Sequence, residues 1–339
     1  MLRKTVKLLS AIAISLLLNG CSGEPEPAPA SAPAPPAEDA VVAGYSLGTV
    51  TELNQTCAAG TQPGVECRTL EVACPNLPSI QLTLQINAPG TAATPRGTIV
   101  FSSGGGGTGY YAAPELFQAL QDKGFRVVDR AWAETWYGGG QGIRKGACHY
   151  ATLATWVHQN VHTGGAFCGS GNSGGAAEVG HAMATYGRGA IFDHVMPTGG
   201  PAVARLDYAC LGQNNPEWLQ QCDALIPDSA NWQCTPACTL GAQGGVCTAI
   251  GANPTEHDLL YDSVLAPDAL LKYTRTKMDF IEGTQDCQIS PVMGTLFHNT
   301  VLSLKSLQYV RDTPHAVSST AAGRSAMVDA LDRECIVRH

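Results

Sequence analysis

The chain has 339 residues, of which 44% are hydrophobic and 14% are charged. That hydrophobic share can form a large core, so a wholly disordered chain is excluded. The formal net charge of −8 offers no basic surface for nucleic acid. Thirteen cysteines are far more than a reducing compartment usually tolerates without a metal or redox reason, which favours an oxidising one.

Residues 1–20 have the three parts of an export signal, and positively charged residues open it. The apolar run over 8–18 is too short to span a bilayer, which needs about 20 residues. The Leu-Asn-Gly-Cys sequence that ends at Cys21 resembles the lipobox of bacterial lipoproteins. That resemblance implies that Cys21 carries lipid and that Ser22 after it directs sorting to the outer membrane. An ordinary secretory signal is the alternative.

Residues 21–40 are rich in proline and alanine. Such a stretch stays extended and packs no core, so it is interpreted as a semi-rigid tether. The tether is predicted to join the lipid anchor to one folded domain over 41–339, outside the cytoplasm at the cell envelope.

The other twelve cysteines are predicted to form up to six disulfides, with the connectivity left open. The alternative for three of them is a zinc site, formed by Cys234, Cys238 and Cys247.

Alternating runs at 68–73 and 80–86 predict a β-hairpin. From residue 97 on, strands and helices alternate, which predicts a largely parallel sheet with helices on both faces. The strands are expected at 97–101, 126–129, 166–169, 191–197, 278–282 and 306–310. The helices are expected at 114–123, 145–161, 176–186, 269–276, 292–302 and 321–335. Residues 201–267 lose this periodicity and hold five cysteines, so they are interpreted as a disulfide-stapled insertion.

A G-x-S-x-G motif at 171–175 falls between an expected strand and an expected helix. In that setting the serine sits on a sharp turn that only small neighbours allow, and its hydroxyl is exposed at the sheet edge. Ser173 is therefore the predicted nucleophile, and the backbone N–H of Gly174 is a predicted oxyanion donor. A glycine–serine turn without chemistry is the alternative.

On this motif the chain resembles the α/β-hydrolase superfamily, from about residue 68 to the C-terminus. The resemblance implies the α/β-hydrolase fold with the Cys-rich insertion as a cap, and a serine, aspartate and histidine in that chain order. Asp286 follows an expected strand, and His315 lies between the final strand and the final helix, where the family has its acid and its base. The other candidates for these roles are Asp193, Asp207 and His298.

The stretch from Ser103 to Gly107 is like the HGGG loop of esterases but lacks its histidine. Glycine lets the backbone come close to a substrate, so Gly105 or Gly106 is the predicted second oxyanion donor. Aromatic residues follow the neighbouring strands and are predicted to line an acyl or aromatic-acid pocket, with core packing as the alternative; they are Tyr110, Tyr111, Trp132, Trp136 and Tyr137.

Residues 104–109 also match the dinucleotide pattern G-x-G-x-x-G, with Asp129 twenty residues after the loop. Four consecutive glycines satisfy many patterns, however, and this interpretation leaves Ser173, Asp286 and His315 without a role.

The sequence therefore predicts an exported serine hydrolase that cleaves small, feruloyl-type or polyester carboxylic esters through an acyl-enzyme. It is expected to be a monomer on a lipid anchor in the membrane, with an ester substrate, no cofactor, no metal and no nucleic-acid partner. The alternatives are an exported serine peptidase, disfavoured because no propeller domain precedes the catalytic part, and a non-catalytic surface-binding lipoprotein.

Overall fold

A computed structural model describes residues 42–58, 61–62, 64–90, 94–226, 232–240 and 245–338. The predicted signal peptide, the lipid-modified Cys21 and the proline-rich tether lie outside the described residues.

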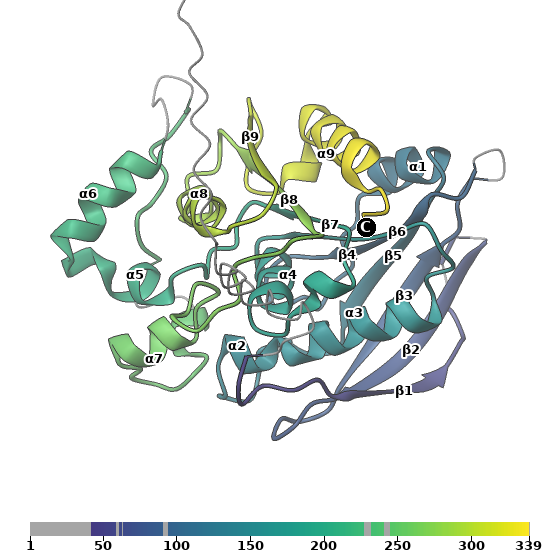
Figure 1. Ribbon diagram of the computed structural model, residues 1–339, viewed down its shortest axis with the longest axis horizontal. Helices are drawn as coiled ribbons and strands as arrows, with labels where there is room; N and C mark the ends of the chain where they lie inside the picture. The colour runs from purple at the N-terminus through teal and green to yellow at the C-terminus, as the bar shows by residue number, and fades with distance from the viewer. Residues whose placement is uncertain are drawn as a thin grey trace, which may run out of the picture. The chain divides into compact units, whose positions relative to one another are not determined.

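The described strands form one sheet in the order β1-β2-β3-β5-β4-β6-β7-β8-β9 (Figure 1). Pairings among β1, β2, β3 and β5 are antiparallel, and all pairings from β5 to β9 are parallel. The strands are β1 (Thr49–Asn54), β2 (Val65–Ala73), β3 (Ile80–Asn87), β4 (Gly97–Ser102), β5 (Phe125–Trp132), β6 (Ala166–Asn172), β7 (His194–Thr198), β8 (Lys277–Gly283) and β9 (Lys305–Val310). The predicted hairpin and the mostly parallel sheet are confirmed.

Helices cover both faces of the sheet, as predicted (Figure 1). One face packs against α1 and α9, and the other packs against α3, α4 and α8. The helices are α1 (Pro114–Asp122), α2 (Ile143–Gly146), α3 (Cys148–Asn160), α4 (Gly174–Ala184), α5 (Leu206–Leu211), α6 (Pro216–Leu225), α7 (Glu256–Tyr261), α8 (Ser290–Thr300) and α9 (Ala321–Glu334). Strands β4, β6 and β7 are buried along their whole length because helices cover both of their faces.

Two predicted helices differ from the structure, and one strand was not predicted. The helix predicted at 269–276 is wrong, because the backbone of this segment bonds instead to the last residue of α4 and to a residue just after α8: Leu270 N donates to Ala184 O, and Leu302 N donates to Leu271 O. The helix predicted at 145–161 is two helices, α2 and α3. Strand β1 was not predicted, because it is an edge strand with mostly exposed side chains.

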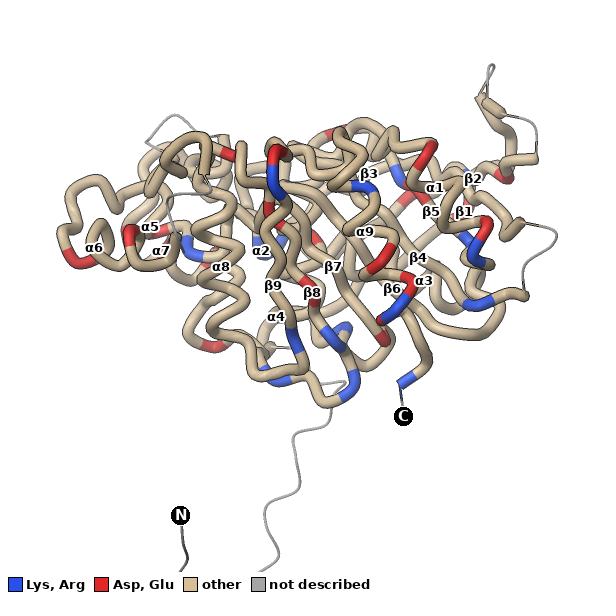
Figure 2. The backbone as a smooth tube through the Cα atoms, turned by 90° about the horizontal axis from the view of Figure 1, so that it is seen from above, with Lys and Arg blue, Asp and Glu red and all other residues tan. Residues whose placement is uncertain are grey.

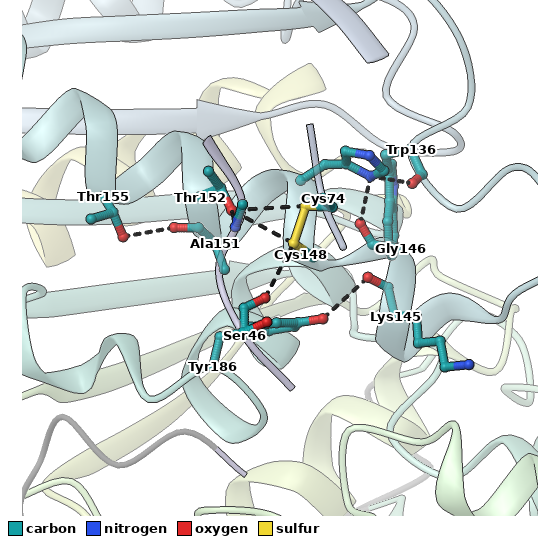
Figure 3. The surroundings of a disulfide bond; sticks show 12 residues. Ser46, Cys74, Trp136, Lys145, Gly146, Cys148, Ala151, Thr152, Thr155 and Tyr186 are labelled. Atoms are coloured by element: carbon teal, nitrogen blue, oxygen red, sulfur yellow. Dashed lines mark hydrogen bonds between the residues drawn. A yellow bond between two sulfur atoms is a disulfide. The ribbon is translucent and has the colours of Figure 1, made fainter. Parts of the chain in front are cut away.

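The twelve cysteines after the tether form six disulfides, as predicted. The zinc alternative is wrong, because Cys234, Cys238 and Cys247 belong to three different disulfides. Figure 3 shows the Cys74–Cys148 disulfide, which ties the end of β2 to the start of α3 beside the hydroxyl of Thr152.

The predicted insertion contains α5, α6 and α7, which lie beyond α8 at one end of the sheet (Figure 1). Two disulfides, Cys210–Cys247 and Cys222–Cys238, close within it. A third, Cys234–Cys287, joins it to the turn that follows β8. The insertion is therefore fixed covalently to a turn at the carboxyl edge of the sheet.

Residues of both charge signs are interspersed along the described part of the chain (Figure 2). None of the helices in the part of the chain that the structure describes has both the length and the apolar character needed to cross a bilayer.

Candidate functional site

Ser173 occupies the turn between β6 and α4, with a positive φ of 56° that is unusual for a residue with a side chain. The flanking glycines are required by close backbone approach. A Cβ on Gly171 would lie 2.3 Å from the carbonyl carbon of Gly175, and a Cβ on Gly175 would lie 2.1 Å from the carbonyl oxygen of Ser102. The turn therefore has the strand–turn–helix setting that the motif predicted, with its serine only partly buried.

Asp286 and His315 meet although they follow different strands. Asp286 lies in the turn after β8, and its Oδ2 is 2.6 Å from Nδ1 of His315, in the loop after β9. The other carboxylate oxygen accepts the backbone N–H of Gln288 at 2.9 Å. The Asp286 side chain is fully buried, whereas that of His315 is 21% exposed. The carboxylate thus orients the ring, and Nε2 is left as the nitrogen that can act on a substrate.

The turn after β7 lies between the nucleophile turn and the histidine loop. A Cβ on Gly199 would lie 3.4 Å from Nδ1 of His315, and a Cβ on Gly200 would lie 3.7 Å from Cα of Ser173. Two consecutive residues thus contact the serine on one side and the imidazole on the other. His315 and Asp286 are therefore in contact, and the turn after β7 lies beside both His315 and Ser173, at the carboxyl edge of the parallel strands, where reactive groups of such sheets gather.

Asn172, the first of the two variable residues of the motif, connects these segments and was not singled out from the sequence. Its Oδ1 accepts the hydroxyl of Thr198 at 3.1 Å and the backbone N–H of Val317 at 3.4 Å. Asn172 therefore connects the nucleophile turn to the end of β7 and to the segment just after His315.

The glycine loop after β4 packs directly on the nucleophile turn. A Cβ on Gly104 would lie 3.3 Å from Cβ of Ser173, and a Cβ on Gly174 would lie 2.0 Å from the carbonyl oxygen of Gly105. Only glycine allows this contact between Gly105 and the first residue of α4. The first N–H groups of a helix have no partner within the helix, so the N–H of Gly174 is open to a ligand there.

Gly106, the other predicted donor, packs against Thr135 and Trp136. Its carbonyl oxygen accepts the backbone N–H of Trp136 at 3.2 Å, and a Cβ on it would lie 2.5 Å from Oγ1 of Thr135. Of the two predicted loop residues, Gly105 is the one that lies against the nucleophile turn.

The predicted pocket aromatics occupy different environments. The Tyr110 hydroxyl donates to Thr83 at 2.7 Å and lines an open cavity of about 790 Å³ between α1 and β3. Tyr111 donates its backbone N–H to both oxygens of Asp129 at 3.0 Å, and burial raises the pKa of its phenol. Trp136 is only 1% exposed and packs edge-on against Tyr137 in the core.

The rival acids and the rival histidine lie elsewhere. The Asp193 carboxylate accepts backbone N–H groups from Phe167 and Arg338 near the amino ends of β6 and β7, at the opposite edge of the sheet. Asp207 pairs with Arg205 at the start of α5. His298, on α8, contacts its neighbour Asn299 through Nδ1 at 3.0 Å.

The dinucleotide alternative also lacks its structural setting. The glycine loop does not open a helix, because α1 begins only at Pro114, and the Asp129 carboxylate already accepts the N–H of Tyr111. Among the residues that the structure describes, no group of histidine, cysteine and acidic side chains is arranged to hold a metal.

Glu282, near the end of β8, is a fully buried carboxyl that sequence reasoning missed. Its Oε1 accepts the backbone N–H of Gly200 at 3.2 Å. Burial, together with the charge of Asp286, raises the pKa of Glu282 well above its ordinary value. The sequence gives little signal for Glu282, because β8 also contains the charged residues Lys277 and Asp279.

No family model and no curated protein sequence matches the chain. Solved structures do match it. The acylaminoacyl peptidase of Pyrococcus horikoshii has a TM-score of 0.51 at 12% identity, over 82% of this chain and 43% of the peptidase. The chain is also similar to an esterase from Thermogutta terrifontis, with a TM-score of 0.44 at 14% identity over 85% of this chain and 99% of that one. For the dienelactone hydrolase of Anabaena variabilis the TM-score is 0.45 at 13% identity, over 81% of this chain and 100% of that one. At such identities the similarity concerns the fold alone, and the chain has the predicted α/β-hydrolase fold.

Proposed function

We propose that this chain is a serine hydrolase that cleaves carboxylic esters, with Ser173 as nucleophile, His315 as base and Asp286 as the carboxylate that orients His315. The observation that carries the proposal is the 2.6 Å contact between Nδ1 of His315 and the buried Asp286, beside the turn that also touches Ser173. A serine activated by an oriented imidazole is the arrangement that nucleophilic acyl transfer requires.

In this mechanism Nε2 of His315 takes the proton of Ser173 as the hydroxyl attacks the ester carbonyl. The N–H groups of Gly174 and Gly105 stabilise the oxyanion of the tetrahedral intermediate. His315 then returns the proton to the departing alcohol, which leaves an acyl-enzyme. Water activated by the same imidazole hydrolyses the acyl-enzyme, and Asp286 stabilises the imidazolium in both steps.

An ester, rather than a peptide, is the proposed substrate because the glycine loop from Ser103 to Gly107 is like that of esterases. Small esters, feruloyl-type esters and polyesters all fit this chemistry. Tyr110 and Tyr111 lie in the segment between the glycine loop and α1, and we propose that they contact the substrate.

A fluorophosphonate probe at neutral pH tests this proposal. Labelling at Ser173 that disappears in Ser173→Ala is the expected result, and no labelling of the parent, with Ser173→Ala indistinguishable from it, would overturn it. Turnover of p-nitrophenyl esters beside p-nitroanilide peptides then separates esterase from peptidase, because faster anilide cleavage would favour the peptidase. A folded protein without turnover of either would favour a binding lipoprotein.

We further propose that the domain is exported and lipid-anchored at the cell envelope. The six disulfides support an oxidising compartment, and the lipobox-like sequence before Cys21 supports the anchor. Incorporation of labelled palmitate tests this, with Cys21→Ser as the control. Equal labelling of both proteins, or of neither, would contradict the anchor.

A further inference from the structure

Arg130 and Glu178 form a buried ion pair beneath the glycine loop. Arg130 lies on β5 and Glu178 lies on α4, and both side chains are 0% exposed. Nη2 of Arg130 donates to Oε2 of Glu178, and the indole N–H of Trp132 donates to Oε1 at 2.6 Å. Removing two charges from water is costly unless each finds several partners, so a pair buried this deeply calls for a functional reason.

Both terminal nitrogens of the Arg130 guanidinium also hold the glycine loop. Nη1 donates to the carbonyl oxygen of Gly107 at 2.7 Å, and Nη2 donates to that of Ser103 at 3.3 Å. The backbone N–H of Trp132 donates to the same Gly107 oxygen at 2.9 Å. Gly107 has a φ of 74°, and a Cβ on it would lie 2.4 Å from Nη1 of Arg130. The guanidinium therefore donates hydrogen bonds to both ends of the loop that contains Gly105.

Glu178 belongs to the helix that the nucleophile turn opens. It lies one turn after Gly174, the first residue of α4. The ion pair thus joins the helix that presents the N–H of Gly174 to the loop that presents the N–H of Gly105. A planar guanidinium suits this task, because it holds several acceptors at once in fixed directions.

We propose that Arg130 and Glu178 are positioning residues that set the separation of the two oxyanion donors. This inference rests on the proposed function. Donors must lie within about 2.7–3.1 Å of the developing oxyanion, and a displacement of about 1 Å in such a site can cost about 100-fold in rate. The glycine loop lacks the histidine that begins the esterase pattern. Its two ends are instead stabilised by hydrogen bonds from Arg130 to the carbonyl oxygens of Ser103 and Gly107.

The double variant Arg130→Met/Glu178→Gln tests the proposal. It removes both charges at similar volume and keeps an acceptor for the indole of Trp132. We expect kcat for p-nitrophenyl acetate to fall about 100-fold while KM stays within about threefold. Backbone amides between 103 and 109 should exchange faster with deuterium, because the two carbonyl anchors are lost.

Arg144→Met is the matched control. Arg144 is also a buried arginine against α4, but it bonds to Thr185 at the other end of that helix and to Asp268. We expect it to lower the melting temperature and to leave kcat, KM and the exchange of 103–109 at the parent values. Arg130→Lys keeps the charge but loses the planar guanidinium that bonds to several acceptors at once. It should lower kcat about tenfold while the melting temperature stays near that of the parent.

Unchanged kcat and unchanged exchange in a folded double variant would overturn the proposal. If the double variant does not fold, the same two results for Arg130→Lys would overturn it. Loss of activity in Arg144→Met equal to that in the double variant would also overturn it, because the effect would then be general destabilisation. If the parent cleaves no ester, the proposed function fails, whereas the exchange of 103–109 still reports whether the pair holds the loop.

Discussion

The two halves of the candidate site are built in different ways. The nucleophile half consists of the Ser173 turn and the glycine loop, and close backbone packing fixes it: a Cβ at Gly171, Gly174 or Gly175 would meet backbone atoms at 2.0–2.3 Å. The acid–base half consists of two loops, after β8 and after β9. The Asp286–His315 hydrogen bond and the backbone bond from Gln285 N to Thr313 O join the two loops, and the Cys234–Cys287 disulfide ties the first of them to the insertion.

This difference separates activity from stability. Changes in the nucleophile half should damage the packing of β4, β6 and α4, and therefore stability and activity together. Changes in the acid–base half should lower activity while the sheet remains intact, because Asp286 and His315 lie on turns at its edge.

The largest effect is expected from Asp286→Asn. The amide keeps the size of the carboxylate but favours the wrong tautomer of His315, so kcat should fall by about 10⁴ while the melting temperature changes little. Steady-state kinetics and thermal denaturation measure the two quantities. Asp193→Asn, at the opposite edge of the sheet, should leave kcat unchanged. A kcat for Asp286→Asn within tenfold of the parent would mean that another acid serves His315.

In the nucleophile half, Gly175→Ala should destabilise the whole fold. Its Cβ would lie 2.1 Å from the carbonyl oxygen of Ser102, so β4 or α4 must shift. We expect a loss of about 3 kcal/mol in the free energy of unfolding, together with most of the activity. Gly109→Ala is the control, because a Cβ there meets nothing within 4 Å. Urea denaturation that finds equal stability for the two variants would contradict the comparison.

The same difference explains how far the sequence could predict the site. Ser173 and its glycines were predicted because five consecutive residues contain the whole turn. Asp286 and His315 were predicted from their order along the chain relative to the expected strands, and the structure brings them together. By contrast, the Arg130–Glu178 pair spans 48 positions and involves buried polar groups. No periodic pattern marks such a contact.

The fold follows the same rule. Strongly periodic segments were predicted to within a few residues, as for α9 and β8. The segment 269–276 contains residues that favour a helix, but its backbone groups bond to the end of α4 and to the chain just after α8. Such tertiary contacts override the local preference and leave no signal in the sequence. The cysteine count gave six disulfides, whereas the partner of each cysteine depended on the folded chain.

A smaller effect, confined to the acid–base half, is expected on removing the disulfide beside Asp286. Cys234→Ser/Cys287→Ser frees the turn from the insertion and should cost about 2 kcal/mol in stability and about threefold to tenfold in kcat. Cys57→Ser/Cys67→Ser, which opens a bridge with a sequence separation of only 10 between β2 and the segment before it, is the control. The control should lose less stability and keep the parent kcat. Equal kcat for both double variants would show that the bridge does not position the acid.

The smallest effect is expected where the two halves meet, at Glu282, which accepts the N–H of Gly200 in the turn between Ser173 and His315. The raised pKa of Glu282 means that the folded protein holds this proton more tightly than the unfolded chain. The contribution of Glu282 to the stability of the parent should therefore fall as the pH rises above about 4.5, the ordinary pKa of glutamate. Glu282→Gln keeps the acceptor and removes the proton.

The melting temperature of Glu282→Gln relative to the parent should accordingly be higher at pH 8 than at pH 4, with kcat nearly unchanged. Thermal denaturation at the two pH values measures this difference. A gap between variant and parent that is the same at both pH values would mean that Glu282 titrates as in the unfolded chain. A large fall in kcat would instead place Glu282 among the groups that act on His315, and the turn at Gly200 would then belong to the acid–base half.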